Sequence, residues 1–181
     1  MGKKLKILAC PSNHGGCAYY RILLPLQKLE EHFGEEVEVR WDDNPLGWVA
    51  SNNGEKGSKT PDNFNYENLE WADVVFTQNI HNFGGEYTIE ILRKAHEFGA
   101  FTHFDTDDLL TDLYEGHRLF DVYTDQQLGK ITEYIYNNVD LVSVTQRKFA
   151  ERIAPYVKCA LVVIKNTIDY NLPCWNAPKR P

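Results

Sequence analysis

The stretch LKILACPSNHGG, residues 5–16, decides the fold class of this 181-residue chain. Leu5 to Cys10 is a short, mainly apolar run typical of a buried strand, and a polar turn with paired glycines follows it. Next comes an amphipathic stretch in which apolar residues recur at helical spacing, namely Ile22, Leu26, Leu29 and Phe33. We expect Gly34 to end this helix and Pro25 to kink or restart it, because proline cannot donate to the preceding turn. The order strand, turn, helix predicts a βα unit.

The same alternation continues along the chain. Further strands are expected at residues 37–41, 73–77, 101–104, 141–144 and 161–164, and further helices at 84–98, 124–138 and 147–157. This pattern predicts an α/β protein, a Rossmann-like three-layer sandwich with a mainly parallel sheet of about six strands. Residues 42–65 lack periodicity and predict a long loop carrying Trp48 and Phe64. We expect residues 1–165 to form one domain and residues 166–181, with three prolines, to form an interdomain linker or tail.

Composition argues against several classes of protein. With 26 acidic and 19 basic residues the formal net charge is -7, so nothing in the bulk charge favours nucleic acid or an anionic membrane as partner. The longest apolar run, residues 159–164, is far shorter than the roughly 20 residues of a membrane-spanning helix. The four cysteines form no C-x-x-C pair, so neither a zinc site nor a disulfide framework is suggested. We expect a cytoplasmic protein with reduced thiols, no cofactor and no resident metal.

Ligands of open α/β sheets bind where the strands end, so the turns after the strands are the candidate sites. In the first turn, Gly15 and Gly16 allow close approach of a ligand just ahead of a helix N-terminus, beside His14. Tyr20 and Arg21 follow in the first helical turns, and Arg21 could fork onto a phosphate or carboxylate. The turn lacks both the G-x-G-x-x-G and the P-loop pattern, so a standard dinucleotide site is not supported. Alternatively it is only a tight turn with an exposed histidine and a solvated arginine.

Two other turns are unusual. Asp105-Thr106-Asp107-Asp108 holds three carboxylates that repel one another unless a metal, an arginine or a substrate hydroxyl compensates. Asp-x-Asp is also the spacing with which many sugar transferases of another fold hold a divalent metal. The alternative is a helix N-cap with acidic residues in its first turn. Residues 77–85 form a polar loop that contains Asn79 and ends in paired glycines, and it could be no more than a loop.

Taken together, these stretches resemble the N-terminal, acceptor-side domain of nucleotide-sugar glycosyltransferases of the GT-B architecture, in the compact versions met in phage genomes and surface-polysaccharide clusters. The resemblance spans nearly the whole chain. It rests on LKIL at residues 5–8 running into HGGCAYYR at 14–21, on ADVVFTQ at 72–78, on FDTDD at 104–108 and on VVIKNTID at 162–169. The order and spacing of these pieces make the match stronger than any one of them.

The resemblance implies two Rossmann-like domains facing a cleft, the first binding the sugar acceptor and the second holding the nucleotide-sugar donor, usually without a catalytic metal. This chain would then supply a half-site, with the donor reached only through a missing C-terminal domain. Asp105 or Asp107 would be the general base toward the acceptor hydroxyl. The other candidate cleft residues bind substrate: His14, Gly15, Gly16, Tyr20, Arg21, Asn79 and Asp108.

Two other functions stay open. One is a self-sufficient transferase that holds a divalent metal with Asp105 and Asp107. The other is a non-catalytic Rossmann-like binding module that uses the loop at residues 42–65 as its contact surface. A phage origin would make modified DNA a conceivable acceptor, but no basic patch large enough to hold DNA stands out. The sequence leaves the sugar, the acceptor and assembly into a homo-oligomer undetermined.

Overall fold

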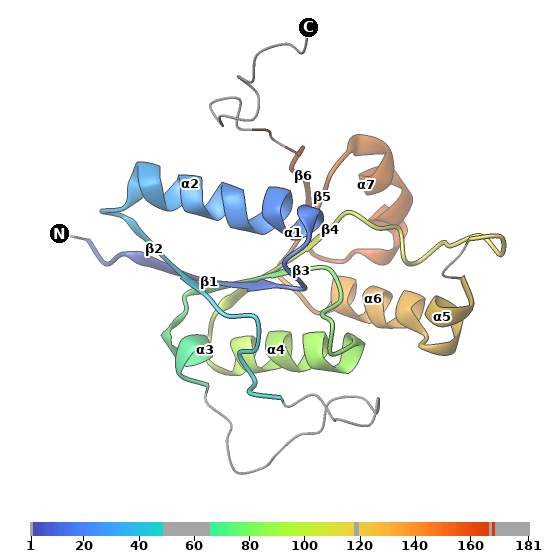
Figure 1. Ribbon diagram of the computed structural model, residues 1–181, viewed down its shortest axis with the longest axis horizontal. Coiled ribbons are helices and arrows are strands. Elements are labelled where there is room, and N and C mark those ends of the chain that lie inside the picture. Colours follow the sequence, from blue (N-terminus) through green and yellow to red (C-terminus); the bar gives the residue numbers. More distant parts are fainter. Residues whose placement is uncertain (1, 49–65, 118–119, 167, 169–181) are drawn as a thin grey trace, which may run out of the picture.

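Six parallel strands form one sheet in the computed structural model, which describes residues 2–48, 66–117, 120–166 and 168 (Figure 1). The strands are β1 (Leu5–Pro11), β2 (Val37–Trp41), β3 (Val74–Gln78), β4 (Phe101–Thr106), β5 (Leu141–Val144) and β6 (Ala160–Val163). Their order in the sheet is β2-β1-β3-β4-β5-β6, and every neighbouring pair is parallel. The predicted α/β class and parallel sheet are therefore confirmed.

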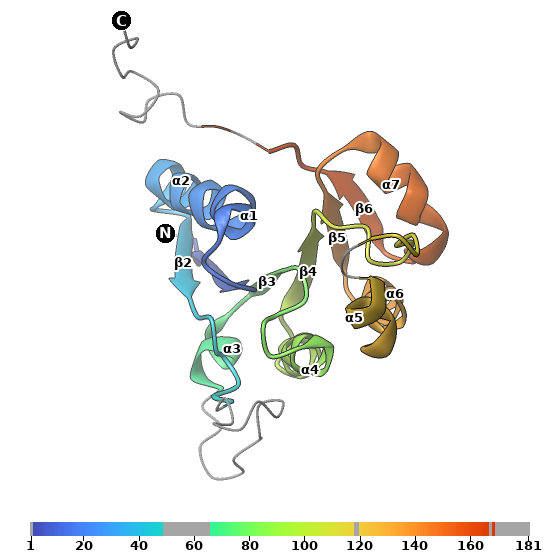
Figure 2. The same cartoon turned by 45° about the vertical axis from the view of Figure 1, so that its right-hand side comes forward.

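Helical segments cover both faces of the sheet. They are α1 (Gly16–Ala18), the π-helix η1 (Tyr19–Leu23), α2 (Leu24–Phe33), α3 (Glu67–Trp71), α4 (Gly85–Glu97), α5 (Phe120–Asp125), α6 (Leu128–Asn137), α7 (Arg147–Ile153) and the 3-10 turn η2 (Ala154–Tyr156). Figures 1 and 2 show α2 on one side of the sheet and α3, α4 and α6 on the other. This is the layered arrangement of a Rossmann-like three-layer sandwich.

Three apolar clusters hold these layers together. On the α2 face, Ile22 and Leu26 pack against Ile7, Val39 and neighbours from β1 to β3. On the other face one cluster joins α3 and α4 to β1 and β3, and another joins α4, α6 and α7 to β4 and β5. Alternate residues of β1 and of β3 enter opposite clusters, because side chains of a strand point alternately to its two faces. The sheet is thus fixed from both sides, and its turns project from a rigid edge.

The first helix departs from the expected shape. Pro25 lies in the first turn of α2, and the backbone stays right-handed helical at Leu23 and Leu24, so the hydrogen-bond pattern changes there without a break in the helix. The π-helix η1 precedes it, and the Leu24 amide donates to the Tyr19 carbonyl five residues back. Gly34 is the C-cap as expected, although its φ of −58° is right-handed rather than left-handed. A π-helix widens the turn and re-aims its side chains, which here include Arg21.

Other boundaries shift by a few residues. The sequence pattern does not predict α3, it ends β4 two residues early, and it merges α5 and α6 into one helix at residues 124–138. Gln127, with φ of 52°, separates these two helices, because a left-handed residue cannot continue either of them. Most of the predicted loop and of the predicted tail, residues 49–65, 167 and 169–181, lies outside the described residues.

Candidate functional site

The carboxyl edge of the sheet has a switch in strand order between β1 and β3. The chain leaves β1 toward β2 on one side, whereas β3 is followed by β4, β5 and β6 on the other. Open α/β sheets bind ligands outside the carboxyl ends of the strands at such a point. Five polar side chains meet there, and we call them the switch-point cluster: Ser12, Gln78, Asn79, Thr106 and Asp107.

Asn79 organises this cluster. Its amide Nδ2 donates to Asp107 Oδ1 at 2.6 Å, and its Oδ1 accepts from Thr106 Oγ1 at 2.8 Å. Its backbone amide donates to the Asp105 carbonyl at 2.8 Å. The φ of 54° puts Asn79 in the left-handed region, which asparagine tolerates better than most residues and which is often used at functional sites. The predicted turns after β3 and β4 therefore lie together, with the Asp107 carboxylate held in a fixed position.

Two further residues connect the turn after β1 to the same carboxylate. Ser12 Oγ donates to Gln78 Oε1 at 2.9 Å, and Gln78 Nε2 lies 3.5 Å from Asp107 Oδ1. The thiol of Cys17, an exposed residue of α1, donates to Asp107, and this bond is the main reason why the pKa of Cys17 rises to about 11. At neutral pH the thiol is protonated and acts as a donor. Cys17 is not among the site residues predicted from the sequence, although its place one residue after Gly16 could have indicated it.

Asp108 lies on the exposed side of the cluster. Burial, and then repulsion from Asp107, raise its pKa above the ordinary value. Asp108 lines a cavity of about 260 Å³ at this edge together with Ser12, Asn13, Asn79 and His81. A small polar ligand in this cavity would face amide and hydroxyl groups as well as a carboxylate.

Arg21 and Asp105 form an ion pair inside the protein. Their side chains are 2% and 0% exposed, and the guanidinium binds both carboxylate oxygens, with Arg21 Nε at 2.9 Å from Asp105 Oδ2. Burial raises the pKa of Asp105, and the bonds from Arg21 and Ser143 oppose that rise. Both residues were expected in the cleft. Because neither reaches solvent, we assign the pair a structural role, and Asp107 is left as the candidate base.

The ion pair also fastens the chain beyond β6. Arg21 Nη1 donates to the Ile164 carbonyl and, at 3.1 Å, to Asn166 Oδ1. Ser143 Oγ donates to Asp105, and His103 Nε2 lies 2.7 Å from the same hydroxyl. Burial, followed by the Arg21 charge, lowers the pKa of His103 to about 4. Arg21 thus joins η1 to β4 and to the start of the segment after the sheet, and Ser143 connects Asp105 to β5.

The remaining predicted residues of the first turn lie at the rim. His14 is exposed and its Nε2 lies 3.0 Å from Asp43 Oδ2. Gly15 donates its amide to Asn13 Oδ1 at 2.7 Å, and a Cβ on Gly15 would meet that oxygen at 2.8 Å. That oxygen is the end of a flexible side chain that can move aside, and Gly16 has no atom within 4 Å of such a Cβ, so packing does not strictly demand glycine at either position. Tyr20 is half-buried, with its ring edge-on to Tyr19.

His81 holds the loop after β2 against the loop after β3. Its Nδ1 accepts from the Phe83 amide at 3.1 Å, so its Nε2 carries the proton and donates to the Asp43 carbonyl at 2.8 Å. Burial lowers its pKa, which keeps the ring neutral. His81 therefore has a structural role, and this loop pairing could not be seen in the sequence.

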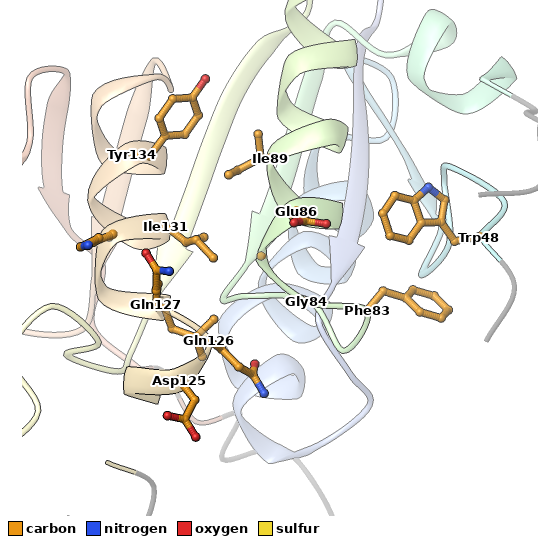
Figure 3. Close-up of a pocket in the computed structure, with 13 residues that line it drawn as sticks. Trp48, Phe83, Gly84, Glu86, Ile89, Asp125, Gln126, Gln127, Ile131 and Tyr134 are labelled. Atoms are coloured by element: carbon orange, nitrogen blue, oxygen red, sulfur yellow. The ribbon is translucent and has the colours of Figure 1, made fainter. Parts of the chain in front are cut away.

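A larger cavity of about 660 Å³ lies next to the site, between the N-terminal turns of α4 and α6 (Figure 3). The two helices come close because Gly85 has no side chain: a Cβ there would lie 2.5 Å from Ile131 Cγ2. The close-up shows Ile89 from α4 and Ile131 from α6 directed into the space between the helices. The wall near α5 carries Asp125, Gln126 and Gln127.

No family model matches the chain, and no curated protein matches it. Within the described residues there is no group of three or more His, Cys, Asp or Glu side chains that could hold a metal ion. A cation shared by Asp105 and Asp107 would have to displace Arg21 from its buried ion pair, so the geometry does not favour that alternative. No helix in the part of the chain that the structure describes is long and apolar enough to cross a membrane.

Proposed function

We propose that this chain is the acceptor-side domain of a sugar transferase of the GT-B type, in which Asp107 is the general base. The observation that carries the proposal is the half-buried Asp107 carboxylate, which Asn79 holds at the switch point. Asn79 itself and the next residue, Asp108, line the polar cavity of about 260 Å³ at this edge. The sequence resemblance adds the class of reaction. The proposal extends to a nucleotide-sugar donor bound by a second domain.

The reaction assigns one task to each group. The acceptor hydroxyl lies against Asp107 and gives its proton to the carboxylate as its oxygen attacks the anomeric carbon of the donor. A new C–O glycosidic bond forms, the bond between that carbon and the diphosphate oxygen breaks, and the nucleoside diphosphate leaves with the electron pair. Asn79 orients the carboxylate, and the Cys17 thiol gives up its bond to Asp107 when the hydroxyl binds.

Burial of Asp105 supports this division of roles. A general base must come within hydrogen-bond reach of the proton it removes, and a carboxylate whose side chain is 0% exposed does not meet that condition. Asp107 does, because the strand has ended before it and it lies at the edge. Of the two candidate bases predicted from the sequence, only Asp107 fits.

Donor binding is tested by calorimetric titration of the 181-residue chain with nucleotide-sugars and nucleoside diphosphates, with and without Mn²⁺. A half-site predicts no tight binding in either condition. Tight, metal-dependent binding that is lost in Asp107→Asn would contradict the half-site and support a metal-dependent transferase.

Catalysis is tested in the longest natural polypeptide that contains this chain. Sugar transfer to an acceptor is measured for the wild type and for Asp107→Asn. Absence of turnover with every donor, despite binding of a sugar or a protein, would support a non-catalytic binding module instead.

A further inference from the structure

Three adjoining cavities extend from the loops at the switch point to the space between α4 and α6. The cavity at the switch point, about 260 Å³, shares Gly84, Gln126 and Leu128 with the cavity of about 660 Å³. That larger cavity shares Ile89 and Tyr134 with a third, of about 330 Å³, which continues along the two helices. We call this row of three adjoining cavities the α4–α6 groove, and it begins beside the switch-point cluster.

The lining of the groove combines apolar and hydrogen-bonding groups. Ile89 and Ile131 line its central part, and the ring of Tyr134, 52% exposed, stands beside them (Figure 3). Gln126 and Gln127 provide amide donors and acceptors at the end near the switch point. A sugar presents apolar C–H faces that pack on aromatic rings, and hydroxyls that pair with amides and carboxylates. The lining therefore suits a carbohydrate.

Charge distinguishes a neutral glycan from a nucleic acid in this groove. The larger cavity carries Glu86 and Asp125 against one cation, Lys130. In the third cavity Arg93 is already paired with Glu90 and Glu97. A groove for a phosphate backbone needs a surplus of positive charge that these residues do not supply.

The length of the groove indicates a chain of sugars. The 13 residues of α4 span about 20 Å at the rise of an α-helix. A single sugar would fill only the first cavity, whereas several linked rings reach from the switch point to the third. We propose that the α4–α6 groove binds an oligosaccharide acceptor whose reacting end lies at the switch-point cluster, two of whose members, Ser12 and Asn79, line the first cavity. The position of the reacting end rests on the proposed function, whereas the assignment of a carbohydrate as the ligand rests on the lining of the groove alone.

A glycan array first selects linear, neutral oligosaccharides from disaccharide to hexasaccharide. The isotopically labelled 181-residue chain is then titrated with them, and NMR spectra record the binding. We expect backbone amides of α4 and α6 that line the groove to shift, and affinity to rise with each added sugar until the groove is full. Tyr134→Ala should weaken binding of the longer sugars at least tenfold. Tyr114→Ala, which removes an exposed tyrosine outside the groove, is the matched control and should bind as the wild type.

The outcomes separate this inference from the proposed function. No binding of any glycan, shifts confined to residues outside the groove, or equal loss in the two tyrosine variants would overturn the oligosaccharide groove. If Asp107→Asn abolishes transfer in such a case, the proposed function still stands. If oligosaccharides bind the groove while Asp107→Asn transfers sugar normally, the groove stands and the catalytic proposal fails.

Discussion

Removing Arg21 should destabilise the protein more than any exposed ion pair could. In Arg21→Met the buried Asp105 carboxylate loses two guanidinium bonds and keeps only the Ser143 hydroxyl. Breaking a buried ion pair by removing one partner costs about 3–5 kcal/mol, because a charge is left without compensation away from water. Domains of this size are stable by about 5–15 kcal/mol, so the loss is a large fraction of the total.

Urea unfolding followed by circular dichroism measures the effect. The matched control is Arg152→Met, which removes the arginine of the exposed Arg152–Asp112 pair and should cost no more than about 1 kcal/mol. Adding Asp105→Asn to Arg21→Met should restore part of the lost stability, because the uncompensated charge is gone. A loss for Arg21→Met as small as that of the control would refute the assignment of this pair to a structural role.

Three other predictions concern single groups. His103 in the folded protein stays neutral down to its pKa of about 4, whereas in the unfolded chain it takes up a proton near pH 6.5. The free energy of unfolding should therefore fall by about 3 kcal/mol as the pH drops from 6.5 to 4. In His103→Gln the urea concentration at the midpoint of unfolding should depend less on pH. An unchanged profile in that variant would contradict the account of the histidine. Gly85→Ala should cost about 1–3 kcal/mol because its Cβ meets Ile131, while Gly16→Ala, with open space around it, should unfold at the wild-type urea concentration. Asp107→Asn should lower the pKa of Cys17 and raise the rate of its alkylation by iodoacetamide at least about tenfold, measured by mass spectrometry of the Cys17 peptide. An alkylation rate equal to that of the wild type would contradict the hydrogen bond from the thiol to Asp107.

Most of the fold could be predicted because hydrophobic periodicity reports which face of an element is buried. The strands β2 and β5 have the predicted bounds, and Gly99, with φ of 80°, follows α4 as expected. The elements that were not predicted are short. The helix α3 has five residues, too few to show a period, and the π-helix at Tyr19–Leu23 is equally short.

The sequence placed the candidate site at the carboxyl edge of the sheet, and the structure brings some of its residues together there while it buries Arg21 and Asp105. Ligand sites of open parallel sheets lie at the carboxyl ends of the strands, and this rule is enough to place Asn79 and Asp107 at one edge. In the structure Asn79 Nδ2 lies 2.6 Å from Asp107 Oδ1. The sequence could not show that Arg21 reaches Asp105 across 84 positions, because that contact depends on how η1 crosses the sheet. Because this contact buries Asp105, Asp107 is the only one of the two aspartates that we propose as the base.

The most direct measurement of the central claim is the kcat of sugar transfer by the longest natural polypeptide that contains this chain, with Asp107 replaced by Asn. The account predicts a kcat about 10²- to 10⁴-fold below that of the wild type, the usual contribution of a general base. Asp121→Asn, which alters an exposed carboxylate in the first turn of α5, is the control and should leave kcat unchanged. A kcat in Asp107→Asn equal to that of the wild type would contradict the claim that this carboxylate removes the acceptor's proton.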